Sequence, residues 1–137
     1  MNISVILLHA HSALRWIIVV AAIGAVALFG YSWLAKKSFP KPARILGAAY
    51  SGLLDLQVLL GAIFMIYTGV KGAGFPLYRI EHMVLTILAA VVAHLPRKWR
   101  DAAADVYHRN TFLTILASLV LIFVAVAVLP GTGRWDL

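Results

Sequence analysis

The chain has 137 residues, of which 63% are hydrophobic and only 12% are charged, and its mean hydropathy is +0.93. A soluble domain carries about 45–50% apolar and about 25% charged residues, so the composition excludes a water-soluble globule, and the length allows one domain, residues 1–137. The absence of cysteine excludes disulfides, thiolate metal sites and covalent haem attachment, and the net charge of +7 comes from basic residues that flank apolar stretches, which excludes nucleic acid as an expected partner.

The first apolar stretch, residues 4–34, exceeds the about 20 apolar residues that a bilayer-spanning helix needs. It lacks the basic start of a signal peptide and contains two histidines and an arginine, so we expect a retained transmembrane helix. His9 and His11 lie near its start and are followed by Arg15 and Trp16. Because His9 and His11 are about 200° apart around a helix, only one of them can face a given neighbouring helix.

The second apolar stretch, residues 44–68, carries Asp55 and Gln57 near its middle and ends in a glycine-rich turn. A carboxyl group near the middle of a bilayer is costly, so Asp55 requires an explanation. Three roles are open: an ion pair with Arg15, a hydrogen bond between helices, and a proton or quinone site that includes Gln57.

The third apolar stretch, residues 77–95, carries Arg79 and His82 near its start and His94 near its end. In a bundle whose helices alternate in direction, the first and third spans are parallel. His82 is therefore expected at the same depth as the two histidines of the first span. Three histidines at one depth, on two helices, indicate a shared site.

The fourth apolar stretch covers residues 110–129 and is preceded by a polar, amphipathic segment, residues 97–109. We expect this segment to lie on the membrane surface, as a short helix. His108, just before the fourth span, is expected at the same depth as His94, close to water.

Four such spans with short connections predict an all-α, integral membrane, up-down-up-down four-helix bundle. Eight of the twelve lysines and arginines fall in the first and third loops, namely Lys36, Lys37, Lys41, Arg44, Arg97, Lys98, Arg100 and Arg109. Because basic loops remain on the cytoplasmic side, we expect both termini to be periplasmic, in a multi-pass protein of the bacterial inner (plasma) membrane. The lipid bilayer is its first expected partner.

The depth-matched histidines favour a b-type haem between the first and third spans. An electron-transfer haem takes two axial ligands from opposite sides, commonly histidines, and a porphyrin disc fits between the helices of a bundle. We expect His82 to pair with either His9 or His11, with basic side chains near the anionic propionates. The candidate haem-binding residues on this side are His9, His11, His82, Arg15, Trp16 and Arg79.

A second haem, between His94 and His108, is the alternative to a single one. His82 and His94 are separated by about 18 Å along one helix, but also by about 120° around it, so two haems would not share a face. His94 or His108 could instead lie at the membrane interface without a ligand. Copper or zinc would also suit histidines, but no acidic or thioether cluster accompanies them in the sequence, and we expect Met83 to point away from His82.

Several short segments resemble a family of small bacterial four-helix membrane proteins that are described as cytochrome b-like. They are LHAHSALRW at residues 8–16, Glu81-His82-Met83, Ala93-His94, and Asp55-Leu56-Gln57 with Leu60-Gly61. The resemblance covers most of the chain, although its motifs are short. It implies non-covalent haem b, electron transfer in the membrane, and His9 or His11 with His82 as ligands.

The leading hypothesis is thus a membrane b-type cytochrome, an electron-transfer protein or oxidoreductase subunit that exchanges electrons with quinol or with a periplasmic partner. A second hypothesis is a non-catalytic accessory or assembly subunit of a larger respiratory or photosynthetic complex. A third is a small proton-coupled transporter that works as a homo-oligomer and uses Asp55.

Overall fold

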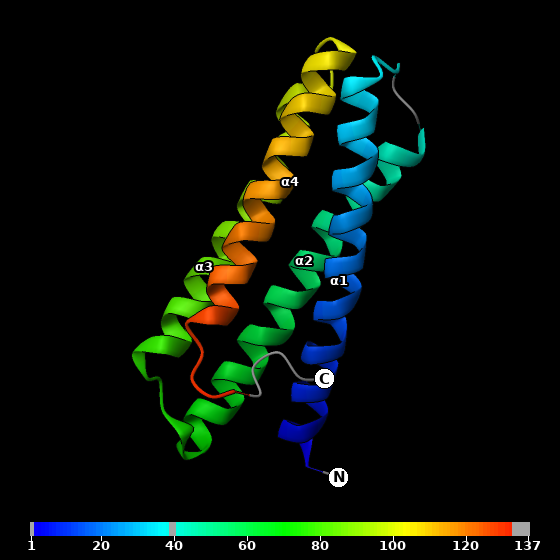
Figure 1. The fold of residues 1–137 in the computed structure, drawn as a ribbon. Coiled ribbons are helices and arrows are strands. Elements are labelled where there is room, and N and C mark those ends of the chain that lie inside the picture. The colour runs from blue at the N-terminus through cyan, green and yellow to red at the C-terminus, as the bar shows by residue number, and fades with distance from the viewer. Residues whose placement is uncertain (1, 39–40, 133–137) are drawn as a thin grey trace.

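The computed structural model describes residues 2–38 and 41–132, and it is built from four long helices (Figure 1). These helices are α1 (Ile3–Leu34), α2 (Lys41–Thr68), α3 (Leu77–His94) and α4 (Ala104–Ala127). All four are long and apolar enough to cross a membrane, and no strand occurs in the described residues. The prediction of an all-α chain with four helices long and apolar enough to span a membrane is therefore confirmed. The termini themselves, residues 1 and 133–137, lie outside the described residues.

Local sequence signals explain where the helices begin and end. The side chain of Asn2 accepts a hydrogen bond from the backbone N–H of Ser4 at 3.1 Å, which caps α1. Pro42 lies in the first turn of α2, where its missing N–H costs nothing. After α2 the chain continues through a π-helical turn (Gly69–Ala73), in which Gly72 has a φ of 113°, a conformation open to glycine.

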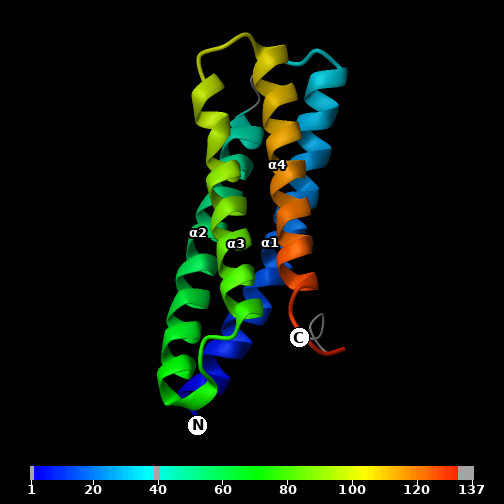
Figure 2. The same ribbon diagram turned by 90° about the vertical axis from the view of Figure 1, so that its left-hand side faces the viewer.

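The four helices form a ring of neighbours. Helix α1 packs against α2 and α4, and α3 packs against the same two, so that α1 and α3 lie diagonally opposite each other (Figures 1 and 2). The start of α1 and the end of α4 lie at the same end of the bundle (Figure 1). Because α1 and α3 are diagonally opposite, two of their residues can meet only across the middle of the bundle. Any site between them is surrounded by all four helices.

The bundle interior is rich in small side chains. The fully or nearly fully buried apolar residues include six alanines, which allow the helix backbones to approach closely. These are Ala22, Ala25, Ala43, Ala89, Ala93 and Ala125. Buried polar side chains bond between the helices: the Tyr50 hydroxyl lies 2.8 Å from Ser118 Oγ, which in turn donates to the carbonyl of Ala89 at 2.9 Å.

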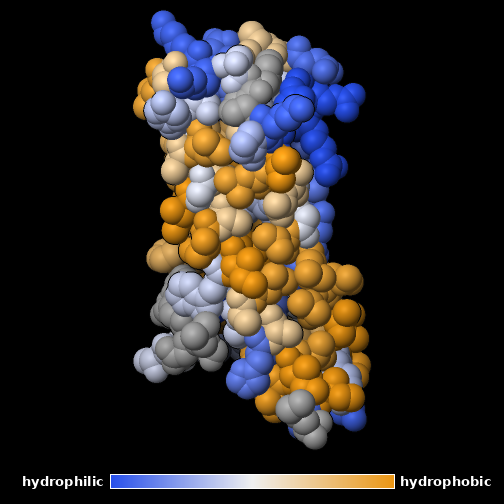
Figure 3. Space-filling view, turned by 90° about the vertical axis from the view of Figure 1, so that its right-hand side faces the viewer, coloured by the Kyte–Doolittle hydropathy of each residue, from blue (hydrophilic) through white to orange (hydrophobic). Residues whose placement is uncertain are grey.

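The outer surface is apolar along most of its length. Figure 3 shows a broad hydrophobic band, with hydrophilic side chains gathered at the end formed by the 35–41 and 95–103 connections. Large apolar side chains such as Val20, Ile23 and Ile45 are mostly exposed. In water such a surface would aggregate, whereas lipid tails cover it without cost. The molecule is therefore described as a multi-pass membrane protein.

One segment differs from the sequence-based expectation. Residues 97–109 were expected to lie on the membrane surface, and α4 was expected to follow them. Instead the chain makes a 3₁₀-helical turn (Leu95–Trp99), and α4 already begins at Ala104. The physical reason is that Tyr107 and His108 are buried against Phe29 of α1, so the early turns of α4 belong to the packed bundle.

Candidate functional site

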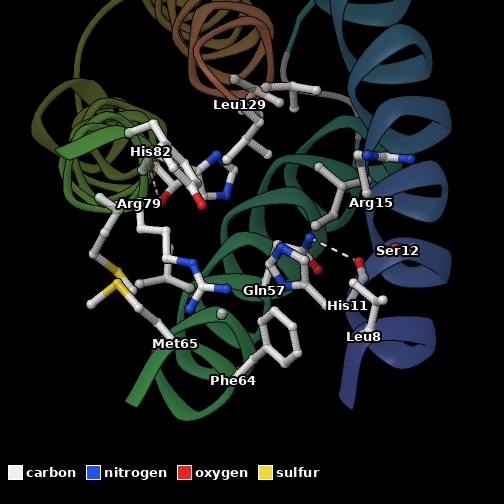
Figure 4. A pocket seen from close by; sticks show the side chains of 18 of the residues that line it. Leu8, His11, Ser12, Arg15, Gln57, Phe64, Met65, Arg79, His82 and Leu129 are labelled. Atoms are coloured by element: carbon white, nitrogen blue, oxygen red, sulfur yellow. Dashed lines mark hydrogen bonds between the residues drawn. The ribbon is translucent and has the colours of Figure 1, made fainter. Parts of the chain in front are cut away.

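A cavity of about 440 Å³ opens between the helices, towards the end of the bundle where α1 starts and α4 ends. Its size falls in the range of about 300–1,000 Å³ that is typical of small-molecule and cofactor sites. Most of the lining is apolar. The polar lining includes His11 and Arg15 of α1, Gln57 of α2, and Arg79 and His82 of α3. Figure 4 shows several of these side chains converging from the three helices.

His11 and His82 face each other across this cavity from the diagonal helices. Their ring centroids are 6.2 Å apart and the ring planes are inclined by 67°. Two imidazoles that bind one metal from opposite sides, with metal–nitrogen bonds of about 2 Å and ring centres about 1 Å behind each nitrogen, have centroids about 6 Å apart. The observed spacing therefore fits a pair of axial ligands.

The ring of His82 is held in one orientation by α4. Its Nδ1 lies 2.6 Å from the backbone carbonyl of Ala125. A carbonyl can only accept, so Nδ1 carries the proton and donates, and Nε2 keeps its lone pair. This carbonyl is available because it lies in the last turn of α4, where the N–H of Leu129 bonds to Val126. A histidine that binds a metal usually shows such a bond from its second nitrogen.

His11 is accommodated by a glycine on α2. A Cβ at Gly61 would lie 3.0 Å from Cε1 of His11, which is tighter than ordinary packing, so a side chain at this position would push the ring aside. Nδ1 of His11 is buried and, within the described residues, has no hydrogen-bond partner. A buried imidazole nitrogen without a partner is costly.

Gln57 ties α2 to α1 beside this histidine. Its side-chain nitrogen donates to the backbone carbonyl of His11 at 2.9 Å, and the residue is only 7% exposed. The amide oxygen of Gln57 is buried and finds no partner in the part of the chain that the structure describes.

Two arginines contribute positive charge to the same cavity. Arg79 extends into it (Figure 4) and donates to the Thr68 hydroxyl at 3.0 Å. Arg15 lies one helical turn beyond His11, and its guanidinium carbon is 5.3 Å from the centre of the Trp16 ring. Trp16 itself is 38% exposed and does not line the cavity, although we expected it to flank a haem.

His9 is exposed and also lies outside the cavity. The choice between His9 and His11, open in the sequence, is thereby decided in favour of His11 as the residue opposite His82. Met83 lines the same cavity, together with Met65 of α2. Consecutive residues of a helix are about 100° apart around its axis, so both can border a wide cavity, and the direction of Met83 relative to His82 stays a prediction.

Asp55 and His94 form a separate pair between α2 and α3. Nε2 of His94 lies 2.9 Å from each carboxylate oxygen of Asp55. The His94 side chain is 27% exposed and the Asp55 side chain is 54% exposed, so the pair lies on the outer surface of the bundle. The ion pair with Arg15, one of the roles considered for Asp55, does not form. Asp55 contacts His94 in its place, because it faces α3 and not α1.

His108 is fully buried and packs against Phe29 and Tyr107, with ring centroids 5.9 and 5.7 Å away. It therefore faces α1, whereas His94 bonds to α2. The structure does not bring His94 and His108 together as two ligands of a second haem. The two side chains point in different directions around their helices.

Sequence reasoning missed the contributions of Gly61, Ala125 and the two methionines. A glycine and a backbone carbonyl carry no chemical signal, and only packing gives them a role. Among residues 2–38 and 41–132, no three histidine or acidic side chains form a group that could hold a metal ion. A haem differs from such a group because it takes only two protein ligands.

Comparison of the chain with protein-family models, with curated proteins and with solved structures finds no match. The resemblance to cytochrome b-like proteins therefore stays a hypothesis.

Proposed function

We propose that this chain is a membrane b-type cytochrome that holds one haem b between His11 of α1 and His82 of α3 and transfers electrons through it. The observation that carries the proposal is the histidine pair itself, with ring centroids 6.2 Å apart inside a cavity of about 440 Å³. A porphyrin disc is apolar, as most of this lining is, and its two axial positions suit imidazoles.

The surrounding residues would have distinct roles. Bound there, haem b would supply a one-electron ferric/ferrous couple. In the neutral ring, the hydrogen bond to Ala125 places the proton of His82 on Nδ1, leaves the lone pair on Nε2 and directs the ring. The side chains of Arg79 and Arg15 offer cations to two anionic propionates. The apolar lining keeps water away and strengthens these charge interactions.

We also propose that the helices form an up-down-up-down bundle with the chain termini on the periplasmic side of a bacterial inner membrane. This is supported by the eight basic residues in the 35–44 and 97–109 segments, because such residues favour the cytoplasmic side. The haem would then lie near the periplasmic face, where quinol in the outer leaflet or a periplasmic protein would exchange electrons with it.

The test is an absorption spectrum of the detergent-purified protein, oxidised and then reduced with dithionite, with the haem and copper contents of the same preparation. We expect a sharp α-band on reduction and one haem per chain. His11→Ala and His82→Ala should each lower the retained haem at least about tenfold, because a lost axial ligand removes a metal–nitrogen bond.

His9→Ala is the matched control, since His9 lies two residues from His11 but outside the cavity. It should retain haem like the wild type. A colourless protein that takes up no added hemin would reject the proposal and favour an accessory subunit of a larger complex. Copper without haem would point instead to a soft-metal site of the histidines and methionines.

The Asp55–His94 pair favours a second candidate, a proton-coupled transporter. A hydrogen-bonded carboxyl and imidazole within a membrane helix pair are typical of proton relays. In proteoliposomes, an imposed membrane potential should drive a proton flux that Asp55→Asn and His94→Gln each lower about tenfold. Asp101→Asn, which changes an exposed acid outside the spans, serves as the control. An unchanged flux in the Asp55 variant would rule out this role.

A further inference from the structure

A second cavity, of about 180 Å³, lies at the opposite end of the bundle from the His11–His82 pair, between α2, the 3₁₀-helical turn after α3, and α4. It shares no lining residue with the first cavity. Three of its lining residues are arginines: Arg44 from α2, and Arg97 and Arg100 from the turn. Residues that are far apart in the sequence are thus brought together around one opening.

No aspartate or glutamate is found among the described residues that line the cavity. Arg44 donates to the backbone carbonyl of Arg100 at 3.4 Å, and its guanidinium lies 5.8 Å from the centre of the Tyr107 ring. Both contacts help to hold the side chain in place. The ion pair between Arg100 and Asp101 is almost fully exposed, so it is weak.

The position of the cavity indicates what kind of anion it would bind. Its arginines belong to the start of α2 and to the connection between α3 and α4, the end of the bundle where the basic loops gather. The two helices that lead to it carry exposed apolar side chains, among them Ile45 and Leu56 of α2 and Leu88 and Val91 of α3. Arginine binds phosphate with two parallel hydrogen bonds, and basic pockets between membrane helices suit anionic lipid head groups. A phosphate above and acyl chains below would match both surfaces.

We propose that this cavity binds the head-group phosphate of an anionic phospholipid through Arg44, Arg97 and Arg100. The bound lipid links α2 to the connection between α3 and α4 at this end of the bundle. The site does not depend on the haem proposal, because the two cavities are separate.

The test is native mass spectrometry of the detergent-purified full chain, titrated with phosphatidylglycerol or with phosphatidylcholine. The wild type should retain one phosphatidylglycerol in preference to phosphatidylcholine. Arg44→Gln, Arg97→Gln and Arg100→Gln should each weaken this binding about fivefold, and the triple variant about a hundredfold. Arg109→Gln is the matched control, since Arg109 is exposed in a neighbouring part of the chain and does not line the cavity.

The Arg97→Gln variant should fold like the wild type, because the Arg97 side chain makes no hydrogen bond to the described residues. A loss of lipid binding in this variant would therefore not result from misfolding. Circular dichroism of every variant should match the wild type. The proposal is overturned if the triple variant binds phosphatidylglycerol as the wild type does, or if Arg109→Gln weakens binding as much as Arg97→Gln. It is also overturned if millimolar inorganic phosphate displaces the lipid, since the ligand would then be free phosphate.

Discussion

At the scale of single residues, the candidate haem site depends on contacts that place two imidazoles opposite each other. His82 is directed by a backbone carbonyl of α4, and His11 by the absence of a side chain at Gly61 of α2. Each histidine is therefore positioned by a helix other than its own. A site of this kind is sensitive to changes that add atoms without altering charge.

Replacing the glycine beside His11 tests this positioning. In Gly61→Ala the new methyl group would lie 3.0 Å from the His11 ring, so the ring must shift. We expect the affinity for hemin to fall about tenfold, equal to about 1.4 kcal/mol, within the range of overpacking effects. Hemin titration followed at the Soret band measures it. Gly52→Ala is the control, because nothing lies within 4 Å of the added Cβ. Equal affinities in the two variants would contradict the role of Gly61.

At the scale of secondary-structure elements, three helices are joined by one buried chain of hydrogen bonds. Ser118 of α4 donates to the carbonyl of Ala89 on α3, and Tyr50 of α2 donates to Ser118. Because the serine hydroxyl has one proton, the direction of both bonds is determined. These bonds connect α2 to the α3–α4 pair near the middle of the bundle.

Removing one hydroxyl from this chain should weaken the packing of α2. Tyr50→Phe deletes its bond to Ser118 but leaves the bond to Ala89 intact, so we expect a loss of about 0.5–1.5 kcal/mol in unfolding free energy. Unfolding in detergent, monitored by circular dichroism, gives this value. Tyr31→Phe, a change at a 60% exposed tyrosine, should have no such effect. A Tyr50 variant as stable as the control would show that the bond contributes nothing.

At the scale of the whole molecule, charge is distributed unequally between the two ends of the bundle. The end formed by the 35–41 and 95–103 connections is hydrophilic and basic, and the histidine cavity lies towards the other end. If the basic end is cytoplasmic, the haem would be accessible to periplasmic electron donors or acceptors. The two proposals for this chain thus predict opposite membrane faces for the haem and for the lipid phosphate.

The orientation is testable because the chain has no cysteine of its own. We expect a membrane-impermeant maleimide to label Thr132→Cys in intact spheroplasts, and to label Ser38→Cys only after lysis. The reason is the preference of basic loops for the cytoplasmic side. Labelling is read as a mass shift on a gel. Ser38→Cys labelled in intact spheroplasts, with Thr132→Cys protected, would invert the proposed topology.

The sequence by itself determined that the chain is helical, that it has four candidate membrane spans, and that His11 and His82 are candidates for one site. Composition and span length suffice for the first two, because a bilayer leaves few alternatives to an apolar helix. Depth along the membrane could also be read from the sequence, since each residue of a helix adds a fixed rise.

Only the tertiary structure decided which side chains meet. His9 and His11 were equivalent by depth, and so were His94 and His108, but rotation of each helix about its axis separates them. That rotation is set by packing, by Gly61 against the His11 ring and by Tyr107 and His108 against Phe29. Asp55 likewise found His94 and not Arg15. Such contacts join residues far apart in the chain, so local patterns carry no record of them.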